Sequence, residues 1–225
     1  MDRQEIVSRM KGFGKWYQNI NLGDGIQTCP SKKFPTRGVN CASLLKAIPK
    51  DLTGKSVLDV GCNAGYFSLI CKERGADCVV GIDYAERSIE MAKFCAEVKD
   101  MDIDYRVMNI QDVAQIGVDF DLVLFIGVLY HLGENLHTCF RELSTCCNDM
   151  MILETSTHPK QLYNPKPLIL DTFKNRNICG NSRPNLAAIE ELFKTNGFTS
   201  IRRLFVGGRA GYAARKPLSP ENCDE

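Results

Sequence analysis

A glycine-rich segment near residue 60 carries the first residues whose types and spacing predict chemistry. Asp59 precedes Gly61 by two positions, and Asn63 and Gly65 follow in a turn between an apolar run and a helical pattern. In open α/β sheets, the turn after the first strand is where a nucleotide-like ligand lies against bare backbone. A carboxylate at Asp59 would repel a pyrophosphate but suits an amine. The spacing therefore favours the methionine end of S-adenosylmethionine (SAM) over a dinucleotide.

Polar residues also follow the next two predicted strands. Asp83 ends the second strand, about twenty residues after the glycine loop, where an acid can accept both ribose hydroxyls. Asn109 ends the third strand, where an amide commonly meets the adenine amino group, and we expect its neighbour Ile110 to line the same site. Each residue alone has a plainer interpretation, since Asp59 could cap a helix and Asp83 could begin one. Their occurrence at three consecutive strand ends favours a SAM site.

The pattern of the chain predicts the elements that position these residues. From about residue 55, strand-like and helix-like segments alternate, as in a parallel sheet with crossover helices. Strands are expected at 56–60, 78–82, 103–108, 120–126 and 150–154, and helices at 66–74, 85–98, 136–147 and 185–196. Two last strands, 198–205 and 211–215, are joined by a linker short enough for a hairpin. The sequence therefore predicts an α/β fold with a doubly wound, seven-stranded, mostly parallel sheet, Rossmann-like as in class I methyltransferases, and an antiparallel final strand pair.

Three parts of the chain follow from this pattern. Residues 1–50 are expected to form a helix and loop that pack against the carboxyl edge of the sheet and cover the active site. Residues 51–216 form the SAM-binding domain, and residues 217–225 a flexible tail. Within the domain, residues 155–183 are less regular because prolines interrupt them.

The composition indicates a cytoplasmic protein that does not span a membrane. The 28 basic and 27 acidic residues nearly cancel, whereas proteins that bind nucleic acid usually carry a basic surplus. The N-terminus lacks the apolar stretch of a signal peptide, and no run approaches the ~18 apolar residues that cross a bilayer. The eleven cysteines include no CxxC pair, so we expect reduced, mostly buried thiols. No cluster has metal-ligand spacing, and no metal is expected.

The residues after the fourth predicted strand resemble a known family most specifically. The run Gly-Val-Leu-Tyr-His at 127–131, the loop at 59–65, Leu-Thr-Gly-Lys at 52–55 and Leu-Glu-Thr at 153–155 resemble the tRNA wobble-uridine methyltransferase/carboxymethyltransferase family and its shorter relatives of unassigned substrate. The resemblance covers most of the chain. It implies SAM as cofactor, or carboxy-S-adenosylmethionine in members that transfer a carboxymethyl group. It also implies that Tyr130 helps to wall the transferred group, and the position of Gly127 after the fourth strand predicts that it lies at the cofactor.

Several residues could serve the acceptor. Methyl transfer from a sulfonium is an in-line displacement, so much of the catalysis can be positioning. A hydroxyl acceptor would need a nearby base. His131 is the leading candidate because imidazole titrates in the useful range, although it could equally be a structural histidine. Glu154 could be the base instead, or could orient the acceptor. The residues expected to line the acceptor pocket are Tyr17, Gln18, Arg37, His158, Arg183 and Arg209.

Three functions fit these residues. The favoured one is an O-methyltransferase that acts on a hydroxyl of a sugar, a glycan or another small polar acceptor and releases S-adenosylhomocysteine (SAH). The near-neutral charge and the N-terminal segment, shorter than in the tRNA enzymes, support it. The second is a tRNA wobble-uridine methyl or carboxymethyl transferase, and the third a non-catalytic SAM-binding partner protein. A dehydrogenase is the rival at the level of the fold. The sequence does not predict an oligomeric state.

Overall fold

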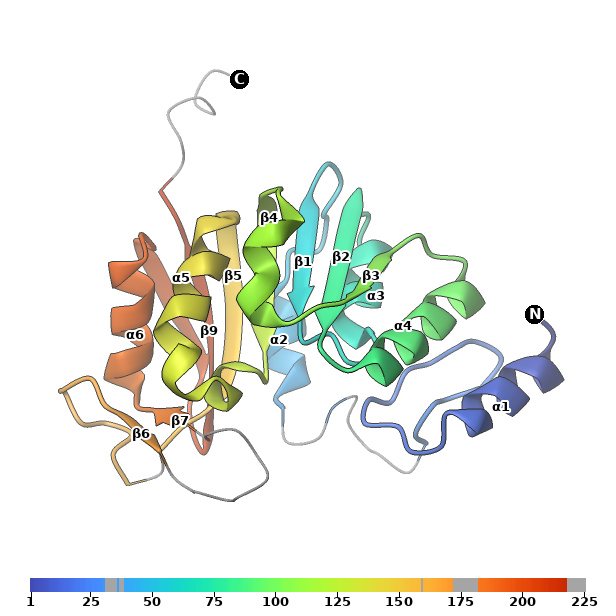
Figure 1. Cartoon of the computed structure of the whole chain (residues 1–225), viewed down its shortest axis with the longest axis horizontal. Coiled ribbons are helices and arrows are strands. Elements are labelled where there is room, and N and C mark those ends of the chain that lie inside the picture. The colour runs from blue at the N-terminus through green and yellow to red at the C-terminus, as the bar shows by residue number, and fades with distance from the viewer. Residues whose placement is uncertain (31–35, 37–38, 159, 172–181, 218–225) are drawn as a thin grey trace.

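The computed structural model describes residues 1–30, 36, 39–158, 160–171 and 182–217 (Figure 1). Its main sheet has seven strands in the order β3-β2-β1-β4-β5-β9-β8. These strands are β1 (Ser56–Val60), β2 (Cys78–Asp83), β3 (Asp104–Val107), β4 (Phe120–Ile126), β5 (Cys147–Ser156), β8 (Ser200–Phe205) and β9 (Arg209–Arg215). The α-helices are α1 (Arg3–Gly12), α2 (Cys41–Ala47), α3 (Tyr66–Glu73), α4 (Glu86–Lys99), α5 (Leu136–Thr145) and α6 (Leu186–Thr195). Short 3₁₀ segments are η1 (Ile110–Ile116), η2 (Leu129–His131) and η3 (Gly133–Asn135).

The order and direction of the strands confirm the predicted fold class. Strands β3, β2, β1, β4 and β5 run parallel to one another, and β9 pairs antiparallel with both β5 and β8. Alternate strand residues face opposite sides of a sheet, and both sides are apolar here. Leu58, Val123 and Phe125 pack with α5 and α6 on one face, while Val57 and Leu124 pack with α2 and α3 on the other. The sheet is therefore covered on both faces, and its strand ends remain for a ligand.

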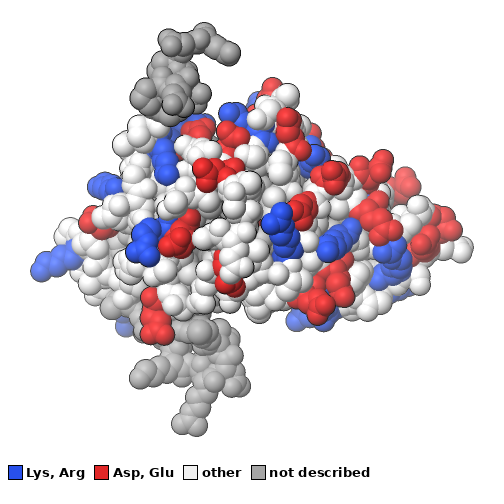
Figure 2. Space-filling view, turned by 45° about the horizontal axis from the view of Figure 1, so that its top comes forward, with Lys and Arg blue, Asp and Glu red and all other residues white. Residues whose placement is uncertain are grey.

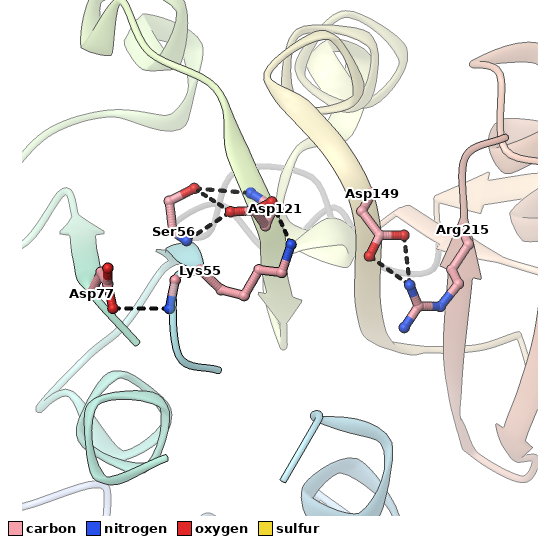
Figure 3. A network of polar contacts seen from close by, with 7 residues as sticks. Lys55, Ser56, Asp77, Asp121, Asp149 and Arg215 are labelled. Carbon is pink, nitrogen blue, oxygen red and sulfur yellow. Dashed lines mark hydrogen bonds and ion pairs between the residues drawn. The ribbon is translucent and has the colours of Figure 1, made fainter. Parts of the chain in front are cut away.

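The amino ends of the central strands, opposite the ligand edge, are joined by polar contacts (Figure 3). Asp121 at the start of β4 accepts hydrogen bonds from the backbone N–H and the hydroxyl of Ser56, at 2.8 and 3.0 Å, and pairs with Lys55 at 3.2 Å. Arg215 pairs with Asp149 between β9 and β5. These contacts fix the relative positions of neighbouring strands, so the strand ends at the opposite edge are also aligned.

The observed element bounds differ from the predicted ones around β5. The strand begins at Cys147 rather than 150, because Cys147 pairs with Phe120 of β4, and it extends to Ser156, because β9 pairs with it as far as that residue. The predicted helix at 136–147 therefore ends at Thr145. A small antiparallel sheet, β6 (Ile169–Asp171) with β7 (Ser182–Pro184), lies in the stretch predicted to be irregular. Strands of three residues carry too little periodicity to be recognised in a sequence.

The N-terminal segment packs on α4 through aromatic side chains. The rings of Phe13 and Trp16 lie 5.6 Å apart, and both contact Phe94 of α4. The Trp16 indole donates a hydrogen bond to the carbonyl of Met10 at 3.0 Å, which fixes the turn after α1. Figure 1 shows α1 and the loop after it beside α4. The segment is thus held against α4, which in turn packs on β2 and β3.

The cysteines that the structure describes are free thiols. Seven of these nine are buried, Cys29 is half-buried and Cys78 is exposed, which agrees with the expectation of mostly buried thiols. Burial raises the pKa of Cys146 to about 11 and that of Cys147 to about 12, so both thiols stay protonated at neutral pH. Within the described ranges, no His, Cys, Asp and Glu side chains gather as a metal site would require. No helix there is long and apolar enough to cross a membrane.

Asn185 organises the loop between β5 and α6. Its side chain is wholly buried and makes four hydrogen bonds. The amide oxygen accepts from the N–H groups of Ala188 at 2.9 Å and Leu168 at 3.1 Å, and the amide nitrogen donates to the carbonyls of Asn164 and Lys166. One side chain therefore caps α6 and holds the loop that leads into β6.

We expect Asn185→Ala to lower the free energy of unfolding by about 2–4 kcal/mol, because it removes a cap and leaves buried backbone groups unpaired. Asn40 is the matched control, since it also caps a helix but is exposed and makes one capping bond, to Ser43. We expect Asn40→Ala to cost about 1 kcal/mol or less. Urea unfolding of the two variants measures both values. Equal losses would contradict the role of Asn185 in the loop.

Candidate active site

A cavity of about 770 Å³ lies at the carboxyl ends of β1, β2 and β4. Its volume is in the range of small-molecule and cofactor sites. Twelve residues proposed from the sequence line it: Tyr17, Gln18, Asp59, Gly61, Asn63, Asp83, Asn109, Ile110, Gly127, Tyr130, His131 and Arg209. Four others lie outside this lining: Gly65, Glu154, His158 and Arg183. Arg37 is outside the described residues.

The glycine loop has the left-handed backbone that its composition predicts. Gly61, Asn63 and Gly65 have φ angles of +69°, +52° and +83°. A Cβ at Gly61 would lie 2.4 Å from a methyl group of Val128, and one at Gly65 would lie 2.2 Å from the Tyr105 hydroxyl oxygen. Gly65 is therefore required by protein packing as well as by its φ. Asparagine tolerates this φ better than most residues, which explains Asn63.

Asp59 is a buried carboxylate at the end of β1. Only 2% of its surface is exposed, and it accepts a hydrogen bond from the Ser68 hydroxyl at 2.5 Å. Burial raises the pKa of Asp59 to about 6, and the negative charge of Asp83 adds to this, whereas the Ser68 hydrogen bond opposes it. A cationic amine in the cavity would stabilise the ionised form.

Asp83 connects the glycine loop to the start of α4. One of its carboxylate oxygens accepts from the N–H of Asn63 at 3.0 Å, and the other accepts from the N–H of Ala85 at 2.9 Å. Burial raises its pKa. Each carboxylate oxygen can accept more than one hydrogen bond, so Asp83 can still accept from a ligand hydroxyl.

The third strand end contributes Asn109 and Ile110 to the cavity. The Asn109 side-chain oxygen caps η1 by accepting from the N–H of Gln111 at 3.1 Å. Its amide nitrogen remains a donor. Residues not proposed from the sequence also line this side: Tyr84, Met108 and Gln111. They adjoin Asp83 and Asn109 in the chain, and that adjacency was the available signal for them.

Gln18 fixes the N-terminal segment to the glycine loop. It is 5% exposed, donates to the carbonyl of Cys62 at 3.3 Å and accepts from the N–H of Tyr66 at 3.1 Å. Its amide thus bridges the loop and the first residue of α3. Tyr17, beside it, is 48% exposed and also lines the cavity. The N-terminal segment therefore forms one wall of the site.

A group of aromatic and charged side chains forms the wall after β4. The ring centroids of Tyr130 and His131 are 4.0 Å apart, and the Arg209 guanidinium carbon is 5.1 Å from the Tyr130 centroid. Arg209 donates hydrogen bonds to both carboxylate oxygens of Glu154, from Nε to Oε1 and from Nη2 to Oε2, the latter at 2.7 Å. Its Nη1 donates to the Ser156 hydroxyl at 3.0 Å. Glu154 has no exposed surface. Its oxygens are engaged by Arg209, and it does not line the cavity.

The His131 ring is open to solvent at the cavity wall. The surrounding protein nevertheless removes part of its hydration, which lowers the pKa of the imidazole, and the positive charge of Arg209 lowers it further. A lowered pKa means that His131 is neutral at pH 7 and can accept a proton.

The remaining acceptor candidates lie near this wall without lining the cavity. The Nδ1 atom of His158 accepts a hydrogen bond from the backbone N–H of Gln161 at 3.2 Å. The backbone N–H of His158 donates to the carbonyl oxygen of Pro184 in β7. Arg183 is the middle residue of β7, which packs against η2. The Arg183 Nε is buried and has no hydrogen-bond partner within the described part of the chain.

The fold and this site define the class of Rossmann-like methyltransferases. In this protein, the ends of the parallel strands carry two carboxylates, an amide and a glycine turn around one cavity, and an antiparallel strand pair completes the sheet. These groups fit SAM, because carboxylates suit its amine and its ribose hydroxyls.

Comparison with known proteins identifies the family. Residues 36–202, well over half of the chain, match the family model described as a methyltransferase domain, and the chain belongs to this family. It is 37% identical over 114 residues to the ubiquinone biosynthesis O-methyltransferase of Cereibacter sphaeroides, covering 50% of this chain and 46% of that protein. It is 29% identical over 166 residues to the tRNA U34 carboxymethyltransferase of Campylobacter fetus subsp. fetus, covering 68% and 55%. The chain therefore spans about half the length of these relatives.

Solved structures share the fold. The N-terminal domain of EvdMO1, crystallised in the presence of SAH and D-fucose, aligns with a TM-score of 0.72 at 17% identity, covering 96% of this chain and 98% of that domain. Magnesium protoporphyrin IX methyltransferase from Synechocystis PCC 6803, with bound SAH, aligns with a TM-score of 0.61 at 19% identity, covering 95% and 94%. Both comparisons confirm the predicted fold.

We expect the affinity for SAH to fall as the pH drops through about 6, because Asp59 then takes up a proton and no longer attracts the amine. The loss should reach about tenfold for each pH unit below the midpoint. Calorimetric titrations of SAH over this pH range measure it. Asp59→Asn should bind more weakly at neutral pH and lack this pH dependence, while the exposed Asp77→Asn keeps it. An unchanged pH dependence in Asp59→Asn would exclude Asp59 as the titrating group.

Proposed function

We propose that this chain is a SAM-dependent methyltransferase that methylates a hydroxyl of a sugar, a glycan or another small polar acceptor, with His131 as general base. One observation carries the proposal: the imidazole of His131, whose pKa is lowered, lines the same cavity as Asp59, Asp83 and Asn109. A proton acceptor is thereby placed beside a site whose groups fit the methyl donor.

Different residues of the cavity are proposed to bind the methyl donor and the acceptor. Bound SAM supplies an electrophilic methyl group on a sulfonium. Asp59 is proposed to hold the amine, Asp83 the ribose hydroxyls, and Asn109 with Ile110 the adenine. His131 orients the acceptor hydroxyl and takes its proton on a ring nitrogen as the oxygen–carbon bond forms and the carbon–sulfur bond breaks. SAH and the methylated acceptor are then released.

The charges of the cavity favour a neutral acceptor. Among the described lining residues, Arg209 is the only Lys or Arg, and it is paired with the buried carboxylate of Glu154. No unpaired cation of that lining would hold a phosphate, or the carboxylate of carboxy-S-adenosylmethionine. Tyr17 and Tyr130 offer aromatic faces, which suit the apolar faces of sugar rings. Methyl transfer to a neutral hydroxyl therefore fits better than carboxymethyl transfer.

The names of relatives support an oxygen acceptor. The relative from Cereibacter sphaeroides is named as an O-methyltransferase, and the structure of the EvdMO1 domain was determined with a sugar present. The tRNA U34 carboxymethyltransferases are the second candidate for function because one of them matches 68% of the chain. On the face in Figure 2, Lys and Arg side chains are interspersed with Asp and Glu, without the broad basic patch that tRNA binding favours.

Incubation with methyl-labelled SAM and separate pools of free sugars, glycans, phenols and bulk tRNA tests the proposal. We expect label in a sugar or glycan pool. His131→Gln should lower kcat by about 10²-fold or more and leave SAH affinity unchanged, since it removes the base and not the cofactor site.

The control variant is His137→Gln, whose side chain is exposed on α5 away from the cavity lining. It should retain full activity. Labelling of tRNA in preference to sugars would support the second candidate, and SAH binding with no labelled pool would support a non-catalytic partner. Full activity of His131→Gln would exclude His131 as the base.

A further inference from the structure

A partly buried ion pair, Arg209 with Glu154, lies beside the acceptor wall, the part of the cavity that Tyr130 and His131 line, and has no assigned role in the reaction. Glu154 lies on β5 opposite Gly211, and Arg209 lies two residues earlier on β9, opposite Ser156. Side chains two positions apart on neighbouring strands share one face of the sheet, so the guanidinium reaches Glu154 and Ser156 together. Such bidentate bonding fixes the guanidinium in one orientation.

The ion pair also contacts the turn that leads out of β4. The N–H of Gly127 donates to the backbone carbonyl of Glu154 at 2.9 Å, which ties this turn to β5. Gly127 has a φ of +76°. A Cβ added at this residue would lie 3.7 Å from Arg209 Nη2 and 3.9 Å from Glu154 Oε2. The paired charges therefore pack directly against the backbone that carries Tyr130 and His131.

The Arg209 guanidinium contacts the Tyr130 ring, and the Tyr130 ring contacts the His131 ring. Arg209 lies over the ring of Tyr130 at 5.1 Å, a cation–π distance, and the Tyr130 and His131 rings are 4.0 Å apart. Charged residues also come from the other elements around His131. Glu154 is at this end of β5, Arg183 is on β7, and Glu134 is on η3. Within the described part of the chain, none of these three side chains has a ring contact that links it to His131 as Tyr130 links Arg209.

We propose that Arg209 is a positioning residue: clamped by Glu154 and Ser156, it holds the Tyr130–His131 ring pair at the acceptor wall and keeps His131 in its neutral, proton-accepting form. Glu154 then fixes and partly offsets the charge of Arg209, although the sequence alone made it a candidate base. The lowered pKa of His131, to which Arg209 contributes, agrees with this arrangement. The inference rests on the proposed role of His131, but its electrostatic part can be measured without an acceptor.

Imidazole NMR on the SAH-bound protein is the test, because the chain has only three histidines. His131→Gln assigns the resonance of His131. Arg209→Gln should raise the titration midpoint of His131, because a positive charge is removed. Glu154→Gln should lower it, because the charge of Arg209 is then no longer offset. Opposite shifts indicate charge, whereas simple loss of packing would change both variants in the same direction.

Two further variants control for folding and location. Arg209→Lys keeps the charge and loses the bidentate clamp, so the His131 midpoint should stay closer to that of the unsubstituted protein than in Arg209→Gln. Arg203→Gln removes a surface ion pair with Glu190 and should leave the titration midpoint of His131 unchanged. Melting temperatures show whether each variant is folded, and Arg209→Lys keeps the test usable where Arg209→Gln does not fold.

A midpoint that does not move in Arg209→Gln, or that moves only in Arg183→Gln, would overturn the proposal. Where an acceptor is labelled, the pH profile of kcat should shift with the His131 midpoint. Shifted midpoints without any labelled acceptor would leave the role of Arg209 supported and count against the proposed function, so the two failures are distinguishable.

Discussion

Two buried carboxylates at neighbouring strand ends impose the main physical constraint on this fold. Asp59 and Asp83 lie at the ends of β1 and β2, and both are more than nine-tenths buried. A carboxylate removed from water needs hydrogen-bond donors. Ser68 of α3 supplies one to Asp59, and the N–H groups of Asn63 and Ala85 supply two to Asp83. The glycine loop, α3 and the start of α4 are thus all placed by these side chains.

The same constraint explains why this part of the site was predictable from sequence. Each signal is local: an acid at the end of an apolar run, a glycine turn, and an amide after the next strand. Parallel pairing then brings separate strand ends to one edge, with Asp59 beside Gly81 and Asp83 beside Val107. Twelve of the proposed residues accordingly line one cavity. Their ligand roles remain proposals.

The parts that sequence did not predict depend on contacts between distant segments. Gln18 lines the cavity, but its hydrogen bond to the glycine loop 44 positions away has no signal in the sequence. Glu154 was proposed as a base or an orienting group, yet its carboxylate is engaged by Arg209, 55 positions away. A glutamate at a strand end has the same sequence signature whether it faces a ligand or a partner cation. Only the antiparallel register of β9 against β5 decides between them.

The glycine loop shows how protein contacts prepare a ligand site. Gln18 bonds the loop from one side, Asp83 accepts from its Asn63, and the Tyr105 hydroxyl occupies the space that a side chain at Gly65 would need. Three contacts from separate segments therefore support the left-handed turns of this loop. Gly65 is therefore needed for the shape of the turn, because it leaves room for the Tyr105 side chain to pack against the backbone between Gly61 and α3.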